Sequence, residues 1–160
     1  VTGDFKPVEP TSKMRSAKLS SGDLLISRSN THDRVGYVGI FEDERDDVSF
    51  PDTMMRLKAN PAVIDPVYLE ALLQASSARE FLMRIAAGTS ASMKKINRAN
   101  LLKMPLRVPS LDAQRSAIQQ LHDLTTAVGQ QRGRLAATRS LIAQISAEAL
   151  AGEAENVQRG

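Results

Sequence analysis

The sequence predicts an α+β protein in which short β-strands and helices are followed by one long C-terminal helix of coiled-coil type. Through the first 110 residues, short apolar runs alternate with Gly, Pro, Ser and Asp, as is typical of short strands and helices. From Leu111 to about Leu150 there is no Pro, and an apolar residue recurs every seven positions. We therefore expect a mixed domain over residues 1–109, a long helix over 110–152 and a flexible tail over 153–160.

The elements of the mixed domain follow in order. The first 20 residues show no apolar period and predict a loop. β-rich runs predict three strands, at residues 24–28, 35–41 and 54–58. Apolar spacing of three and four, with a Pro suited to a first turn, predicts a helix over residues 66–87. The segments after it predict a basic loop at 89–95, a short helix at 97–103 and an extended piece at 105–109.

The long helix carries an apolar stripe, and it is either continuous or divided near Gly129 and Gly133. The residues that we expect to pack against another helix are Ile118, Leu121, Val128, Leu135, Ile142 and Ile145. Such stripes more often pack on their own domain. About 40 residues of helix would however span roughly 60 Å, which exceeds the radius of so small a domain. We therefore expect a homodimer through Leu121, Val128, Leu135 and Ile142, or pairing with the long helix of another chain.

Composition excludes several classes of function. The absence of Cys excludes thiol nucleophiles, Cys-ligated zinc fingers and iron–sulfur sites. Aromatic residues make up 4% of the chain, too few for a surface that stacks single-stranded bases. No apolar run approaches the length of a bilayer span, and no secretory signal precedes the domain, so we expect a cytoplasmic protein without membrane contact.

The formal net charge of +3 conceals a strong polarity. Residues 41–52 contain six acidic side chains and one Arg, whereas residues 79–107 contain seven Lys or Arg and one Glu. The second stretch is suited to contacts with phosphate groups.

No catalytic site, metal site or cofactor site emerges from the residues. His32 and His122 lie far apart, so we expect both to be ordinary polar residues. Asp52 and Lys58 have the spacing of a nuclease motif, but Arg56 stands where the second metal-binding carboxylate would be needed. No Gly-rich turn joins a strand to a helix, so we expect no phosphate cradle. We therefore expect a non-enzymatic protein.

Five stretches, taken in order, resemble one protein family. They are Leu19–Ser29 with its Gly22-Asp23 pair and Arg28-Ser29 end; the strand beginning Val35-Gly36; Pro66-Val67-Tyr68-Leu69; Gly88-Thr89-Ser90 with Ile96-Asn97 and Leu101; and Met104–Leu111 with Gln114 and Ile118. Together they resemble the DNA specificity subunit of type I restriction-modification systems. The chain departs from the family pattern at Val108-Pro109-Ser110, which replaces a Pro-Pro pair, and at Ala113, where Glu usually precedes Gln114.

The resemblance implies a partial target-recognition domain followed by the family's long spacer helix. A full subunit has two such domains and two such helices, so we expect the C-terminal portion of a subunit or a half-length one, lacking the N-terminal part of its recognition domain. The implied function is non-catalytic recognition of a two-part target in double-stranded DNA. The implied partners are the methyltransferase subunits and, through them, the restriction subunit. The alternative is a truncated module that binds methyltransferase subunits or a second copy through its helix without reading DNA.

Two polar loops are the candidate DNA-binding elements. The first follows a strand and combines Arg with Asn, the residues suited to bidentate contacts with guanine and adenine; it comprises Arg28, Ser29, Asn30, Thr31 and Arg34. The second has small residues that would let the backbone approach phosphates; it comprises Ser90, Ser92, Lys94, Lys95 and Arg98. The residue types fit ordinary solvated loops equally well, and the family resemblance favours DNA contact.

Overall fold

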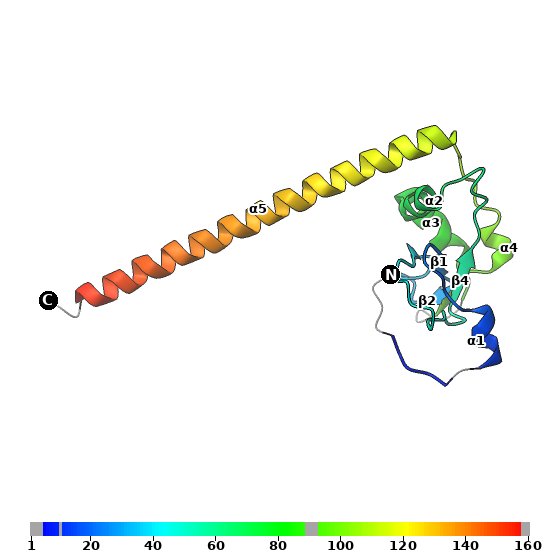
Figure 1. The fold of residues 1–160 in the computed structure, drawn as a ribbon, viewed down its shortest axis with the longest axis horizontal. Helices are drawn as coiled ribbons and strands as arrows, with labels where there is room; N and C mark the ends of the chain where they lie inside the picture. The colour runs from blue at the N-terminus through cyan, green and yellow to red at the C-terminus, as the bar shows by residue number, and fades with distance from the viewer. Residues whose placement is uncertain (1–4, 10, 89–92, 158–160) are drawn as a thin grey trace. The chain divides into compact units, whose positions relative to one another are not determined.

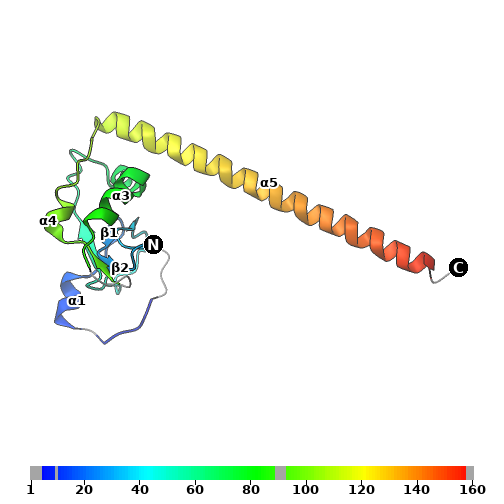
Figure 2. The same cartoon turned by 180° about the vertical axis from the view of Figure 1, so that it is seen from behind.

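A computed structural model of the chain describes residues 5–9, 11–88 and 93–157. Its contacts divide the chain into two compact units, Val1–Ser116 and Ala117–Gly160. Short antiparallel strands and helices form the first unit, and a long C-terminal helix forms the second, as Figures 1 and 2 show. The predicted α+β class is confirmed.

A three-stranded antiparallel sheet lies at the centre of the first unit, with the order β3-β1-β4. The strands are β1 (Leu24–Ser27), β3 (Val38–Ile40) and β4 (Met54–Leu57). In the register of the sheet, Leu25 pairs with Gly39 on one side and with Arg56 on the other. The three predicted strands are therefore present. The second is shorter than predicted because Val35 and Gly36 belong to the turn that precedes β3.

The central strand β1 is buried on both faces, and its side chains alternate between two cores. Leu25 packs with Leu19, Phe41 and Val48 on one face. Leu24 and Ile26 belong to the clusters on the opposite face, which include side chains of the two helices that follow the sheet. This arrangement explains the unbroken apolar run of β1, because a strand covered on both faces has no polar side to alternate.

Two helices replace the single helix predicted over residues 66–87: α2 (Pro66–Gln74) and α3 (Ser76–Ile85). Asp65 caps α2 by accepting a hydrogen bond from the Val67 N–H at 2.8 Å, and Pro66 occupies the first turn. The chain breaks at Ala75, whose backbone is extended (φ −62°, ψ 148°). No Gly or Pro marks this break. It brings Leu82 of α3 into the core beside Ile26, whereas Leu73 of α2 packs with Leu24.

Two further predictions for the first unit were wrong in part. The N-terminal segment is not a loop throughout, because α1 (Ser12–Ser16) forms there. Backbone hydrogen bonds from Leu19 to Val48 and from Phe50 to Ala17 hold the residues that follow α1 in place. The short helix predicted at 97–103 is α4 (Arg98–Leu101), with Asn97 as its N-cap.

The helix α5 (Leu111–Val157) forms the second unit from Ala117 onward, and its residues 111–116 belong to the first unit. The helix is continuous through Gly129 and Gly133, so the divided alternative is wrong. Each of these glycines costs about 1 kcal/mol relative to Ala, and a helix of 47 residues tolerates that cost. The coiled-coil character of α5 stays a prediction. None of the helices that the structure describes combines the length and hydropathy that a bilayer span requires.

Candidate nucleic-acid interface

The two predicted DNA-binding loops are joined in a small antiparallel ribbon. Its strands are β2 (Ser29–Asn30) and β5 (Lys94–Lys95), with Ser29 opposite Lys95 and Asn30 opposite Lys94. The basic loop predicted at 89–95 therefore ends in a strand. Ser90 and Ser92 lie outside the described residues. Residues 64 and 66 positions apart in the sequence thus pair in one surface element, which we call the β2–β5 ribbon.

Backbone hydrogen bonds fix this ribbon to the central sheet. The N–H groups of Arg28 and Ser29 both donate to the carbonyl of Thr53, at 2.8 and 3.0 Å, just before β4. The Ile96 N–H donates to the carbonyl of Arg28 at 2.9 Å, and Ala87 and Lys95 exchange two backbone bonds. Side chains on the ribbon are therefore presented from a rigid support.

The ribbon has one face whose side chains are engaged within the protein and one whose side chains are free. Successive residues of a strand point to opposite faces, so Asn30 and Lys94 share one face, and Ser29 and Lys95 share the other. The Asn30 amide donates to Ser27 Oγ at 3.2 Å and accepts from the Thr31 N–H at 2.9 Å. Lys94 Nζ donates to the carbonyl of Gly88 at 2.6 Å.

On the free face, the Ser29 and Lys95 side chains make no hydrogen bond or ion pair with any residue that the structure describes. Arg98, three residues beyond Lys95, lies in the first turn of α4 and is exposed and unpaired in the same sense. Two cations whose charge is not neutralised within the described chain therefore lie close together in sequence, at the end of the ribbon.

Gly88 lies close to the backbone of Met93, the residue that precedes β5. Its φ is +151°, and a Cβ at this position would lie 2.5 Å from the carbonyl oxygen of Met93. Only Gly can therefore occupy the position without a shift of the backbone. The resemblance motif that begins at Gly88 has a local structural cause.

Thr31 and Arg34, the remaining residues of the first candidate loop, lie in the turn between β2 and β3. The Thr31 carbonyl accepts hydrogen bonds from the N–H groups of Arg34 and Val35, at 3.1 and 2.9 Å, so the turn is compact. Arg34 is exposed and lies 3.9 Å from the carboxylate of its neighbour Asp33. The pKa of Asp33 lies below its ordinary value. The main cause is a hydrogen bond from the Thr31 side chain to the carboxylate, and a hydrogen bond from the backbone N–H of Asp33 has a smaller effect.

Arg28 carries a partly buried guanidinium. Its Nε–H is buried and has no hydrogen-bond partner in the described structure. A buried donor without a partner costs roughly 1–3 kcal/mol. Among the candidate residues that the structure describes, Arg28 is the one with a buried polar side-chain atom that has no partner.

Arg79, on α3, is a residue of the basic stretch whose role the sequence did not indicate. Its Nη1 donates to the carbonyl of Val35 at 2.8 Å, and its Nη2 donates to the carbonyl of Asp33 at 3.0 Å. The guanidinium carbon also lies 4.3 Å from the centre of the Tyr37 ring. Arg79 therefore supports the turn that carries Thr31 and Arg34, and it is not a free cation.

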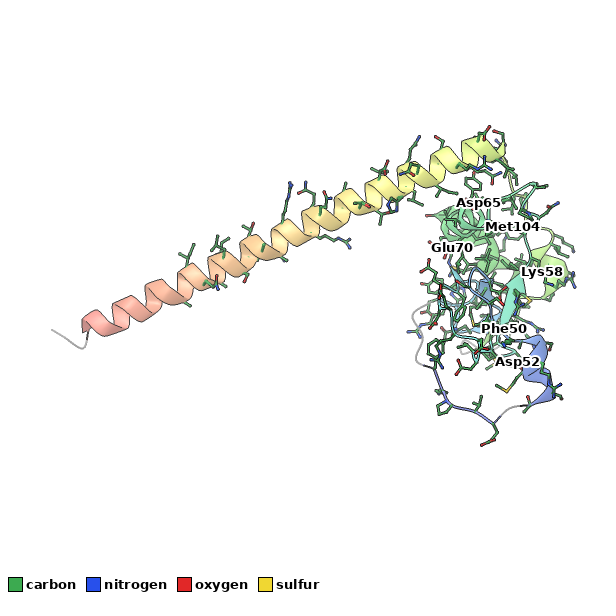
Figure 3. The ribbon with its side chains drawn as sticks, in the orientation of Figure 1. Phe50, Asp52, Lys58, Asp65, Glu70 and Met104 are labelled. Carbon is green, nitrogen blue, oxygen red and sulfur yellow. The ribbon has the colours of Figure 1, made fainter. Side chains whose placement is uncertain are left out.

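Gln114, in the first turn of α5, is the second residue whose role sequence reasoning missed. It is fully buried. Its amide oxygen accepts from the Asp65 N–H at 2.9 Å, and its amide nitrogen donates to the carbonyls of Val63 and Pro109 at 3.0 and 2.8 Å. These bonds link the first turn of α5 to the segment that enters α2; Asp65 is labelled at that position in Figure 3. The resemblance marked Gln114, but nothing local reveals its distant partners.

The remaining candidates from the sequence do not converge on a catalytic site. Asp52 and Lys58 lie at opposite ends of β4 (Figure 3). Arg56 lies between them, and its Nε is 3.3 Å from the carboxylate of Asp23. Among the described residues, no group of three or more His, Asp or Glu side chains could hold a metal ion.

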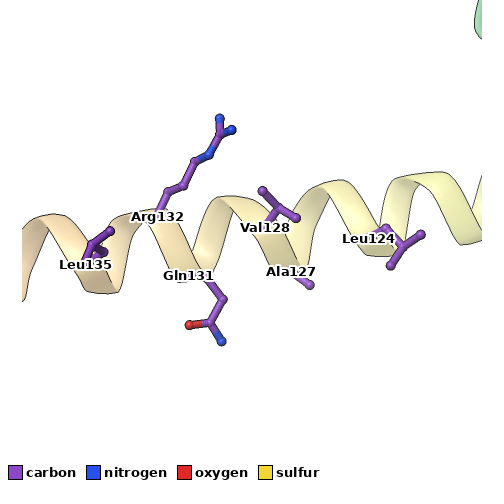
Figure 4. Close-up of a pocket in the computed structure, with 6 residues that line it drawn as sticks. All are labelled: Leu124, Ala127, Val128, Gln131, Arg132 and Leu135. Atoms are coloured by element: carbon purple, nitrogen blue, oxygen red, sulfur yellow. The ribbon is translucent and has the colours of Figure 1, made fainter. Parts of the chain in front are cut away.

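The second unit presents a long exposed apolar stripe. Seven apolar side chains of α5 are between 51 and 65% exposed: Leu121, Leu124, Val128, Leu135, Leu141, Ile142 and Ile145. Ile118 is half-buried. Figure 4 shows Leu124, Val128 and Leu135 following one another along the helix. The shallow depression that they line with Ala127, Gln131 and Arg132 has no second wall, so it is a surface and not a ligand cavity.

No protein-family model matches the chain. Two curated protein sequences are similar to it. The type I restriction enzyme EcoEI specificity subunit of Escherichia coli is 24% identical over 118 residues, which is 74% of this chain and 20% of that protein. A predicted type I restriction enzyme specificity subunit of Methanocaldococcus jannaschii, MjaX, is 26% identical over 112 residues, or 70% of this chain and 26% of that protein.

This chain thus spans about a quarter of the length of the M. jannaschii relative and a fifth of the length of the E. coli relative. Both relatives carry the name of the family that the five motifs indicated. The predicted resemblance to part of a type I specificity subunit is confirmed.

Proposed function

We propose that this chain is the DNA-recognition part of a type I specificity component, and that it directs methyltransferase and restriction subunits to one half of a two-part target in double-stranded DNA. It performs no catalysis itself and acts in the cytoplasm. Residues 1–109 serve recognition, residues 110–152 serve as spacer and pairing helix, and residues 153–160 form a tail. The relatives' names support this assignment at the level of the family.

The observation that carries the proposal is the union of both predicted loops in the β2–β5 ribbon. A two-stranded ribbon fits the major groove of B-DNA, where polar side chains can contact base edges. The free cations Lys95 and Arg98 accompany the exposed polar turn at Thr31 and Arg34. Cations of this kind neutralise phosphates at any sequence, while the turn supplies groups that can distinguish bases.

Arg28 adds a further positive charge beside the ribbon. Its side chain is partly exposed next to the ribbon, so its positive charge attracts an anion there. The Asn30 amide, in contrast, already forms hydrogen bonds with Ser27 Oγ and with the Thr31 N–H. Within the predicted set we therefore assign Asn30 and Lys94 to holding the loops, and Ser29, Lys95 and Arg98 to DNA contact.

Binding of the full chain to a random-sequence 30-base-pair duplex, measured by fluorescence anisotropy at several salt concentrations, tests this proposal. We expect log affinity to fall linearly with log salt, with a slope of about −0.9 for each phosphate neutralised. Replacing Lys95 and Arg98 with Ala should reduce that slope by about 2. Lys58→Ala, an exposed Lys beyond β4, is the matched control and should leave the slope unchanged. Equal effects of the two changes would contradict the assignment.

We propose that the apolar stripe of α5 pairs with a second long helix, belonging either to another copy or to another specificity segment. The helix-packing residues are those predicted from the heptad pattern: Ile118, Leu121, Val128, Leu135, Ile142 and Ile145. The exposure of these side chains supports this proposal, because burying them against a second helix would stabilise the pair by about 25 cal/mol per Å² of apolar surface. In the complex, the same helix contributes to docking of the methyltransferase subunits.

Two copies can pair antiparallel about the level of Gly133, because that arrangement sets Leu121 opposite Ile145 and Leu124 opposite Ile142. Single-Cys variants test this directly, since the chain has no Cys of its own. Mixing Leu121→Cys with Ile145→Cys should give a mixed disulfide dimer under oxidation. A dimer of Leu121→Cys with itself indicates a parallel pair, and monomers in sedimentation at micromolar concentration contradict homodimerisation.

The second candidate function is a structural module that binds methyltransferase subunits or a second copy through α5 without reading DNA. The long exposed stripe of α5 supports helix pairing, and helix pairing is common to this module and to a DNA-recognition component. A chain that pairs through α5 but leaves duplex DNA unbound at low salt would establish this alternative.

A further inference from the structure

We propose that Arg79 is a positioning residue that determines sequence discrimination by fixing the Thr31–Arg34 turn, and that it makes no contact with DNA itself. This inference rests on the proposed DNA-recognition function. Arg79 is one of the seven Lys or Arg residues of the stretch 79–107, and its charge alone would suggest contact with phosphate. We assign it a structural role instead.

The geometry of Arg79 supports a positioning role. Its two terminal nitrogens donate to the carbonyls of Val35 and Asp33, which lie 44 and 46 residues earlier in the chain. The planar guanidinium presents these donors as a fork, which Lys cannot reproduce. The Tyr37 ring lies 4.3 Å from the guanidinium carbon, at the distance of a cation–π contact. The guanidinium is thus held by two carbonyls of the turn and by the ring of Tyr37, the residue before β3.

Arg79 is the side chain outside the turn that donates two hydrogen bonds to the backbone of the turn, so it is well placed to control the conformation of the turn. Gly36 has φ +78°, and a Cβ there would lie 2.9 Å from Leu82 Cβ and 3.1 Å from Arg79 Nη1. The backbone therefore approaches α3 closely at this point. Val35 is fully buried beside Leu82. Thr31 and Arg34, the candidate DNA-binding residues of the turn, are exposed. The turn that carries them is bonded to the Arg79 side chain through the carbonyls of Asp33 and Val35.

Positioning and phosphate contact predict different effects on DNA binding. A cation that contacts phosphate changes affinity for every sequence and changes the salt slope. A residue that only fixes the orientation of base-contacting groups changes the ratio between preferred and other sequences, since phosphate contacts carry no sequence information. Arg79 should change that ratio and leave the salt slope unchanged.

Arg84 provides a matched control. It lies on the same helix, is exposed, and also stacks on an aromatic ring, with its guanidinium carbon 5.2 Å from the centre of Phe81. It makes no hydrogen bond to the turn within the described residues. Arg84→Ala therefore removes the same charge from α3 without removing the support of the turn.

The experiment compares the full chain with its Arg79→Ala, Arg79→Lys and Arg84→Ala variants in two measurements. Amide hydrogen exchange without DNA measures how readily the turn opens. The Lys95 N–H, which donates to the carbonyl of Ala87, is the internal reference. Selection from a duplex library with a randomised core, followed by affinities for the selected sequence and a scrambled one, reports discrimination. Arg79→Lys keeps the charge and guards against misfolding of the Ala variant.

We expect both Arg79 variants to accelerate exchange at Val35 and Gly36 and not at Lys95, and to reduce discrimination about tenfold, the effect of losing one well-oriented base contact. Arg84→Ala should change neither quantity. Unchanged exchange in both Arg79 variants would overturn the positioning role. Faster exchange with unchanged discrimination would overturn the link to specificity while the DNA-binding function stands. If the unmodified chain fails to bind any duplex, the proposed function fails, and the exchange data still decide whether Arg79 holds the turn.

Discussion

Replacing Gln114 with Ala should destabilise the first unit strongly. The Gln114 side chain is fully buried and makes three hydrogen bonds to the backbone of Asp65, Val63 and Pro109, at 2.8–3.0 Å. Each such bond contributes about 1 kcal/mol net, so the loss amounts to about 3 kcal/mol in the free energy of unfolding. The variant also leaves backbone groups without their partner, which adds to the loss.

Gln119→Ala is the matched control on the same helix. Gln119 is exposed, and its amide donates to Asp123 at 2.8 Å, one turn further on. Pairs of this kind contribute about 0.2–0.5 kcal/mol. The two variants therefore remove the same side chain from the same helix in a buried and in an exposed setting.

Urea unfolding followed by tyrosine fluorescence measures the difference. The chain has no Trp, and Tyr37 and Tyr68 both belong to the first unit, so the signal reports that unit and not the rest of α5. We expect the free energy of unfolding to fall by about 3 kcal/mol in Gln114→Ala and by less than about 0.5 kcal/mol in Gln119→Ala. Equal losses would refute the role of Gln114 as the link between α5 and α2.

Three further predictions concern backbone and charge. Gly36→Ala should lower the stability of the first unit by roughly 2 kcal/mol in urea unfolding, and by more than Gly22→Ala, because both have positive φ but only Gly36 meets other atoms within 4 Å; equal effects would contradict the crowding argument. Gly129→Ala and Gly133→Ala should each stabilise exposed α5 by about 1 kcal/mol in thermal unfolding by circular dichroism, whereas a decrease would indicate close packing at these glycines. Asp33 should titrate in carbon-13 NMR below its ordinary pKa, and Thr31→Val should raise that pKa. Because the folded-state pKa is lowered, the contribution of ionised Asp33 is present above the unfolded-state pKa and is lost as pH falls through the folded-state pKa; an Asp33 pKa that Thr31→Val leaves unchanged would refute the hydrogen bond.

The sequence predicted those elements that have a local signal. Apolar runs flanked by Gly and Asp located β1, β3 and β4, and the heptad stripe located α5. The break at Ala75 had no local signal, since Ala and Ser are compatible with helix and the break serves the packing of Leu73 and Leu82 in different clusters. The helix α1 was missed because its support comes from residues 48–50.

Candidate site residues were found by type, but their division into roles required the structure. Strands of two residues are too short to show a period, so the pairing of Ser29 with Lys95 cannot be predicted from the sequence. Arg79 and Lys95 look alike in a count of charges, and only their partners separate a support from a free cation. Gln114 likewise bonds to residues about 50 positions away, beyond any local pattern.

The most direct test of the central claim is selection by the full chain from a duplex library with a randomised core, read by sequencing. A recognition component reads one half of a target, so we predict enrichment of a single short motif. Replacing Lys95 and Arg98 with Ala should weaken the retention of every sequence and leave that motif unchanged. Retention of all library sequences alike, with an affinity set by salt alone, would contradict sequence recognition by this chain.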